Sequence, residues 1–182
     1  MRIKKIKPFL LSSFSVLALC SVIYLSSCKE DNCKALVCAY DGICNDDGSC
    51  TCAIGYEGER CETVTRDKFK GVWTVTEDGS NSNLLVYAAS IEDGNSIDEV
   101  LIRNFNNEFN SAVTANVKGD TIYIPNQSLQ VGEETKTIEG KGYAVREAFY
   151  DRHGKLILNY KVTSADGTVN NYGTENPSIW TK

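Results

Sequence analysis

Cysteine placement constrains this chain more than any other feature. Eight cysteines occur in 182 residues, and six of them lie between Cys33 and Cys61, with none after that. An even, dense set of cysteines in an exported chain indicates a disulfide framework, because so short a segment buries too little apolar surface to fold without crosslinks. The spacing alone leaves the pairing of the six cysteines open.

The first 27 residues have the layout of an export signal. Residues 1–7 carry four basic residues and no acid, and residues 8–24 are apolar or small. The segment ends in Leu25-Ser26-Ser27-Cys28, which resembles the lipobox of bacterial lipoproteins. The resemblance implies cleavage before Cys28, whose sulfur then carries lipid. The alternatives are an ordinary signal peptide and a retained membrane anchor, for which the apolar stretch is marginal in length.

Residues 28–32 are expected to form the lipidated N-terminus and a linker. Lys29-Glu30-Asp31, directly after Cys28, resembles the surface-export signal of Bacteroidota lipoproteins. This resemblance implies a protein held in the outer membrane by its acyl chains, such as palmitate, and exposed at the cell surface. The alternative is that these three residues form only a charged linker.

The cysteine segment also matches a known module. The cysteine spacing, with Gly55-Tyr56 and Gly58 inside its last loop, resembles the epidermal growth factor (EGF)-like module over residues 33–62. Gly55 and Gly58 suit turns in which a side chain would clash, and Tyr56 is expected to be the main aromatic residue of a small core. The resemblance implies three disulfides: Cys33–Cys44, Cys38–Cys50 and Cys52–Cys61.

We expect no metal site in this module. Calcium-binding EGF-like modules carry the pattern Asp/Asn-x-Asp/Asn-Glu/Gln before the first cysteine, whereas here Lys29 leads and Asn32 precedes Cys33. Hard cations need several converging oxygen ligands, so calcium is not expected. Zinc is not expected either, because an exported chain oxidises its cysteines.

Residues 68–182 are typical of an antiparallel sheet, so the whole chain is expected to be mainly β. Runs of alternating apolar and polar residues recur about every ten residues, separated by turns such as Asp78-Gly79 and Asp166-Gly167. This pattern predicts about eight or nine strands in a meander β-barrel, with a β-sandwich as the alternative.

The ends of this region favour the barrel. Gly71-Val72-Trp73 resembles the Gly-x-Trp first strand of lipocalin-like barrels, in which the Trp plugs one end. The alternating run at 178–181 is expected to pair with that first strand, because closure removes exposed sheet edges. Pro125 is expected to end the strand before it, because proline cannot donate to a ladder.

The barrel interior is expected to be filled rather than hollow. An eight-stranded barrel leaves room only for packed side chains or one small ligand, and Trp73 and Trp180 are interpreted as core residues rather than ligand platforms. The other side chains expected to point inward are also large: Ile122, Ile124, Leu156, Leu158, Tyr160 and Val162.

The charge of the chain excludes one class of partner. Removing residues 1–27 takes away four positive charges and no negative ones, which moves the net charge from −5 to −9. Such an acidic protein does not bind nucleic acid by bulk electrostatics.

No catalytic site is expected. His153 is the single histidine, and it lies in a segment interpreted as a hairpin turn. No free thiol and no Gly-x-Ser-x-Gly motif is expected to supply a nucleophile. Two acidic pairs, Glu92-Asp93 and Glu133-Glu134, are interpreted as solvated charge in turns, although a glycosidase needs only two carboxylates.

These observations predict a non-enzymatic interaction or adhesion module with an unidentified protein or glycan partner. The alternative is a lipocalin-like carrier that holds a small apolar ligand in the barrel. An envelope enzyme such as a glycoside hydrolase is the third hypothesis, and no cofactor is expected.

Overall fold

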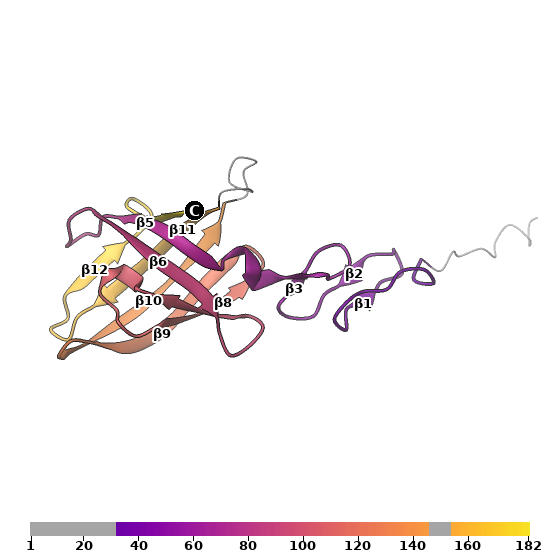
Figure 1. The fold of residues 1–182 in the computed structure, drawn as a ribbon, viewed down its shortest axis with the longest axis horizontal. Helices are drawn as coiled ribbons and strands as arrows, with labels where there is room; N and C mark the ends of the chain where they lie inside the picture. The colour runs from indigo at the N-terminus through magenta and orange to yellow at the C-terminus, as the bar shows by residue number, and fades with distance from the viewer. Residues whose placement is uncertain (1–31, 146–153) are drawn as a thin grey trace, which may run out of the picture.

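The computed structural model describes residues 32–145 and 154–182. The predictions for the export signal, for the lipidation of Cys28 and for His153 lie outside the described residues. Among the residues that are described, no helix is both long and apolar enough to cross a membrane. The described chain forms a disulfide-rich module, residues 33–62, followed along the long axis of the molecule by a β-barrel (Figure 1).

The module is held together by crosslinks rather than by a core. Two short hairpins pair β1 (Ile43–Cys44) with β2 (Cys50–Thr51) and β3 (Tyr56–Glu57) with β4 (Thr63–Val64). Tyr56 is only half-buried and stacks on Tyr40 with 4.2 Å between the ring centroids, and Cys61 is the one fully buried residue of the module. The three disulfides are the pairs that the EGF-like resemblance implies: Cys33–Cys44, Cys38–Cys50 and Cys52–Cys61.

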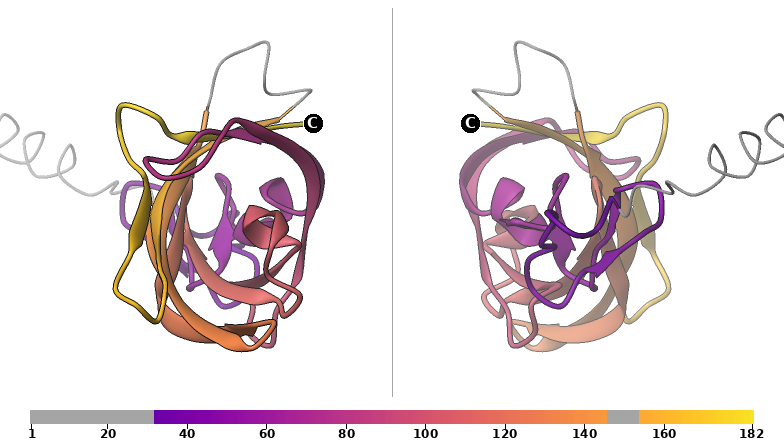
Figure 2. Two further views of the ribbon diagram at one scale, coloured as in Figure 1. Left: turned by 90° about the vertical axis from the view of Figure 1, so that its left-hand side faces the viewer. Right: turned by 90° about the vertical axis from the view of Figure 1, so that its right-hand side faces the viewer.

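The second part is a closed antiparallel barrel of eight strands with one extra strand, which confirms the predicted fold class and selects the barrel over the sandwich. Seen end-on, the strands form a ring (Figure 2). The extra strand, β12 (Val169–Tyr172), pairs with one half of β11. The ring strands are β5 (Gly71–Glu77), β6 (Leu85–Asp93), β7 (Glu99–Arg103), β8 (Val113–Lys118), β9 (Thr121–Val131), β10 (Glu134–Ala144), β11 (Lys155–Thr163) and β13 (Ser178–Thr181).

The last strand closes the ring, as the sequence predicts. β13 lies between β11 and β5, and Trp180 is opposite Leu156 on one side and Val75 on the other. Because β10 also pairs with β11 along its length, the order from β5 to β11 is a simple meander. No sheet edge is therefore left open where the first and last ring strands meet.

The prediction that Pro125 ends its strand is wrong. β9 continues to Val131, and its register with β10 slips at Pro125. Pro125 thus lies at a β-bulge. The strand pairing is already interrupted at a bulge, so the missing N–H of proline does not cost a hydrogen bond between strands. On the other edge of β9, the Gln127 side chain bonds the backbone N and O of Thr114 at 3.0 and 2.8 Å, in place of a strand partner.

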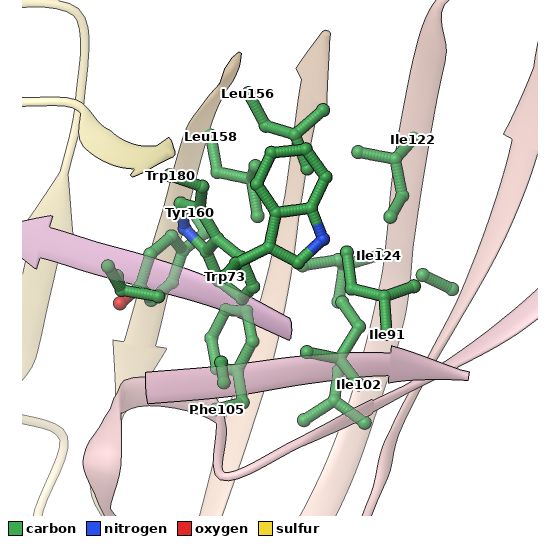
Figure 3. Close-up of a cluster of buried hydrophobic side chains, with 14 of the residues drawn as sticks. Trp73, Ile91, Ile102, Phe105, Ile122, Ile124, Leu156, Leu158, Tyr160 and Trp180 are labelled. Carbon is green, nitrogen blue, oxygen red and sulfur yellow. The ribbon is translucent and has the colours of Figure 1, made fainter. Parts of the chain in front are cut away.

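The barrel interior is filled. All six large residues predicted to point inward are buried, as are Trp73 and Trp180. Figure 3 shows Trp73, Trp180 and the other labelled side chains directed toward one another from the walls of the ring. The indole Nε1 of Trp73 donates to the backbone oxygen of Phe69 at 2.8 Å, so its polar atom is satisfied inside the core.

Candidate functional site

The segment between the module and the barrel is a fixed joint. It forms the short 3-10 helix η2 (Thr65–Lys68), and the Lys68 Nζ lies 2.7 Å from a carboxylate oxygen of Glu57 and 2.9 Å from one of Asp120. One ammonium group therefore holds the module and the β8–β9 turn together. The sequence gives no sign of this role.

Gly55 permits a close approach at the same joint. Its φ is +88°, and a Cβ on it would lie 2.5 Å from the Cγ2 of Ile97, in the turn between β6 and β7. The sequence predicts a turn glycine here, and the structure adds that this turn packs directly on the barrel. Thr65 extends the contact, because its backbone N–H donates to the Gly55 oxygen at 2.8 Å.

A groove of about 1110 Å³ lies between the module and the outside of the barrel. One wall is the module loop 52–56, and the floor is the outer face of β8, β9, β10, β11 and β12. Tyr123 shows why the floor is outer surface: it lies between the buried Ile122 and Ile124 on β9, so its side chain points out. We call this hollow the outer groove.

Four floor residues of the outer groove form one cross-strand row. Asn116 is opposite Tyr123, Tyr123 is opposite Lys141, and Lys141 is opposite Asn159. Tyr123 is 45% exposed. The Oδ1 of Asn159 is buried and has no hydrogen-bond partner among the described residues. We call these four residues the open row.

A second row lies beside it, and its charges are matched. The Glu139 carboxylate accepts a 3.1 Å bond from Asn126, and its other oxygen lies 2.6 Å from the Lys161 Nζ. The hydrogen bond from Lys161 lowers the pKa of Glu139, with that from Asn126 second. Lys161 in turn lies opposite Asn171 on β12. We call these four residues the paired row.

A separate polar cluster lies inside the barrel, at the end away from the module. Glu77 is 2% exposed, and its carboxylate accepts hydrogen bonds from four neutral groups rather than from a cation. One donor, Asn106, belongs to the short helix η3 (Phe105–Asn107), which lies in that end of the ring (Figure 2). The four donors are Tyr87 (2.8 Å), Asn106 (2.8 Å), Tyr160 (2.8 Å) and Ser178 (2.6 Å).

The geometry of this cluster indicates a structural role. Its hydrogen bonds join β5, β6, β11, β13 and η3, and the carboxylate has no orphan oxygen. Burial raises the pKa of Tyr87 and of Tyr160, and the negative charge of Glu77 adds to both shifts. The two hydroxyls therefore remain protonated donors across the neutral pH range.

Some of the motif residues predicted from the sequence line the outer groove, and the others lie away from it. Tyr56 and Gly55 line the outer groove, and the disulfide from Cys52 closes the loop that carries them. Gly58 and Gly71 both have positive φ, at 100° and 120°, but neither lines the groove. Trp73 is in the barrel core and also away from it.

Sequence reasoning missed the residues of both rows and the Glu77 cluster. The rows carry no local motif, because their members come from four strands and meet only through register. The position of Glu77 could have been predicted, because it follows Trp73 and Val75 at a period of two. A strand over these residues places all three side chains, including the carboxylate, inside the barrel.

Within residues 32–145 and 154–182, no group of three or more His, Cys, Asp or Glu side chains could hold a metal ion. The chain matches no protein-family model, and no curated protein or solved structure matches it either.

Proposed function

We propose that this protein is a lipid-anchored lipoprotein of the outer membrane, exposed at the cell surface, which binds a partner without catalysis through the outer groove. The observation that carries the proposal is the groove itself, which two parts of the chain build together. Its volume of about 1110 Å³ is slightly above the range of about 300–1,000 Å³ that is typical of small-molecule sites, so it has room for an extended ligand.

The filled barrel supports a surface role rather than a carrier role. Trp73, Trp180 and the large aliphatic residues occupy the space in which a lipocalin-like carrier would hold its ligand. The groove, in contrast, is open on the outside and is held in shape by the Lys68 joint. A rigid site of this kind binds with little loss of conformational freedom.

The anchor supports display of this site. The proposed lipid-bearing Cys28 lies only a few residues before the first disulfide. In the sequence the module lies between Cys28 and the barrel, and the module and the barrel follow each other along the long axis (Figure 1). A crosslinked module is a suitable spacer, because it does not depend on a hydrophobic core.

The anchor is tested by labelling cells of a Bacteroidota host with radioactive palmitate. We expect the wild-type chain to take up label and to be removed from intact cells by added protease. Cys28→Ser should lose the label, whereas the matched control Cys20→Ser should keep it. Label on the Cys28→Ser variant, or full protection of the wild type in intact cells, would overturn this part of the proposal.

Binding through the groove is tested with a photo-crosslinking amino acid, which reacts with C–H bonds of any partner. We expect adducts on living cells when it replaces Tyr123 in the groove. The control position is Val86, which is also exposed but lies on β6, outside the groove. Equal adducts at both positions, or none at Tyr123, would contradict the proposal.

A further inference from the structure

The open row has hydrogen-bonding capacity that the fold does not use. Asn159 lines the outer groove with its Oδ1 buried and without a partner among the described residues. A buried polar atom left in this way costs free energy and is rare in folded proteins. Rotation of the Asn159 amide toward the groove would present this oxygen to a ligand hydroxyl, and the resulting hydrogen bond would remove the cost.

The neighbour of Asn159 supplies the complementary chemistry. Lys141 is directly opposite Asn159 across β10 and β11, and an ammonium group only donates hydrogen bonds. Acceptor and donor therefore lie side by side on the floor of the groove. A ligand that fits both must donate from one atom and accept at the next, as neighbouring hydroxyl groups do.

The next residue in the row offers an apolar face. Tyr123 is opposite Lys141, and nearly half of its surface is exposed although it has an aromatic ring. Such rings bind ligands that combine an apolar face with a polar edge. A sugar ring has this form, with C–H groups on its faces and hydroxyl groups around its rim.

The charges that line the groove nearly balance, with Lys118, Lys141 and Lys161 against Asp98 and Glu139. In the paired row, Glu139 and Lys161 neutralise each other at 2.6 Å. The mature chain would carry a net charge of −9 after removal of residues 1–27, which repels acidic polymers.

The strand pairing argues against an extended peptide. Peptides that join a sheet need an exposed strand edge. At Tyr123 and Lys141, β9 and β10 are paired on both sides, so the floor of the groove offers only side chains.

We propose that the outer groove binds a neutral oligosaccharide, with a sugar ring on Tyr123 and its hydroxyl groups on Lys141 and Asn159. This inference rests on the proposed function, because it names the partner of the same groove.

The test is an array of neutral and acidic oligosaccharides, probed with the full chain in a sugar-free detergent. We expect binding to neutral members, and at least about tenfold weaker binding for Tyr123→Ala. The matched control is Tyr143→Ala, because Tyr143 is 47% exposed on the outer face of β10 but does not line the groove. This control should bind as the wild type does.

A second variant separates ligand binding from folding. Asn159→Ala removes an acceptor that no described residue uses, so we expect an unchanged or raised Tm together with loss of sugar binding. Absence of binding to all neutral sugars, binding to acidic sugars alone, or binding that survives both Tyr123→Ala and Asn159→Ala would overturn the inference. An empty array together with groove crosslinks at Tyr123 would overturn the sugar ligand and leave the surface interaction standing. An empty array without crosslinks would overturn both.

Discussion

The hydroxyl of Tyr160 donates a 2.8 Å hydrogen bond to Glu77 inside the barrel, between residues 83 positions apart in the chain. The Tyr160 hydroxyl also accepts a hydrogen bond from Asn106 at 2.9 Å. The buried carboxylate therefore organises a network that closes one end of the ring. Such networks stabilise a fold when all their members are satisfied, and they are costly when one is removed.

Glu77→Gln is expected to lower the free energy of unfolding by about 1–3 kcal/mol. Each carboxylate oxygen accepts from two donors, and the glutamine amide replaces one of these oxygens with an NH2 group, so at least one buried donor loses its acceptor. Urea unfolding with the disulfides intact measures the change. The control Glu92→Gln removes an exposed partner of Arg103 and should cost at most about 1 kcal/mol. Equal effects of the two variants would show that the network contributes nothing.

Stability is expected to fall steeply above about pH 10. The pKa values of Tyr87 and Tyr160 are raised in the folded state, mainly by burial. Above the unfolded pKa of about 10, the unfolded chain releases protons that the folded chain retains, so rising pH favours unfolding. Each tyrosine contributes a loss of about 1.4 kcal/mol per pH unit.

Urea unfolding from about pH 8 to about pH 12 measures this slope. Tyr160→Phe should make it shallower, whereas Tyr143→Phe should leave it unchanged, because Tyr143 is exposed. A slope that does not respond to Tyr160→Phe would refute the assignment.

Gly55→Ala is expected to disturb the joint between the module and the barrel. Gly55 and Gly167 have nearly the same φ, +88° and +86°, so alanine at either position costs about 1–2 kcal/mol in backbone strain. Only at Gly55 would the new Cβ also meet Ile97, whereas nothing lies within 4 Å at Gly167. We therefore expect a larger loss of stability for Gly55→Ala, with NMR shifts at Ile97 that Gly167→Ala does not cause. Identical behaviour of the two variants would rule out the contact.

Reduction of the disulfides is expected to unfold the module and leave the barrel folded. Within residues 33–62 only Cys61 is fully buried, so the crosslinks, at about 2–4 kcal/mol each, supply most of the stability. The barrel has a large core, and the chain has no cysteine after Cys61. Amide NMR spectra before and after reduction give the result. Loss of dispersed signals from β5–β13 would contradict it.

Much of the barrel is predictable from the sequence, because its physical cause is local. Alternation with a period of two decides which side chains point inward, and large inward residues such as Leu158 and Trp180 then imply a filled ring. Pairing of the last strand with the first follows from the need to remove open edges. Pro125 shows the limit of such rules, because a bulge in the strand accommodates the missing N–H.

The outer groove is not predictable in this way. Asn159 and Tyr123 lie in one row, with Lys141 between them, only through the registers of three strands. A slip of one residue in these strands would turn their side chains inward. The module wall of the groove depends on Lys68, which reads as an ordinary surface lysine. The ligand site thus comes from long-range geometry, whereas the fold comes from local pattern.

The position of β13 sets an order in which the chain can fold. Each disulfide joins residues 9 to 12 positions apart, whereas ring closure requires Val75 to meet Trp180. A chain that emerges from its N-terminus first has every cysteine of the module available before the closing strand exists. The module can therefore be oxidised early, while the barrel, with its distant pairing, completes only when the final strand has emerged.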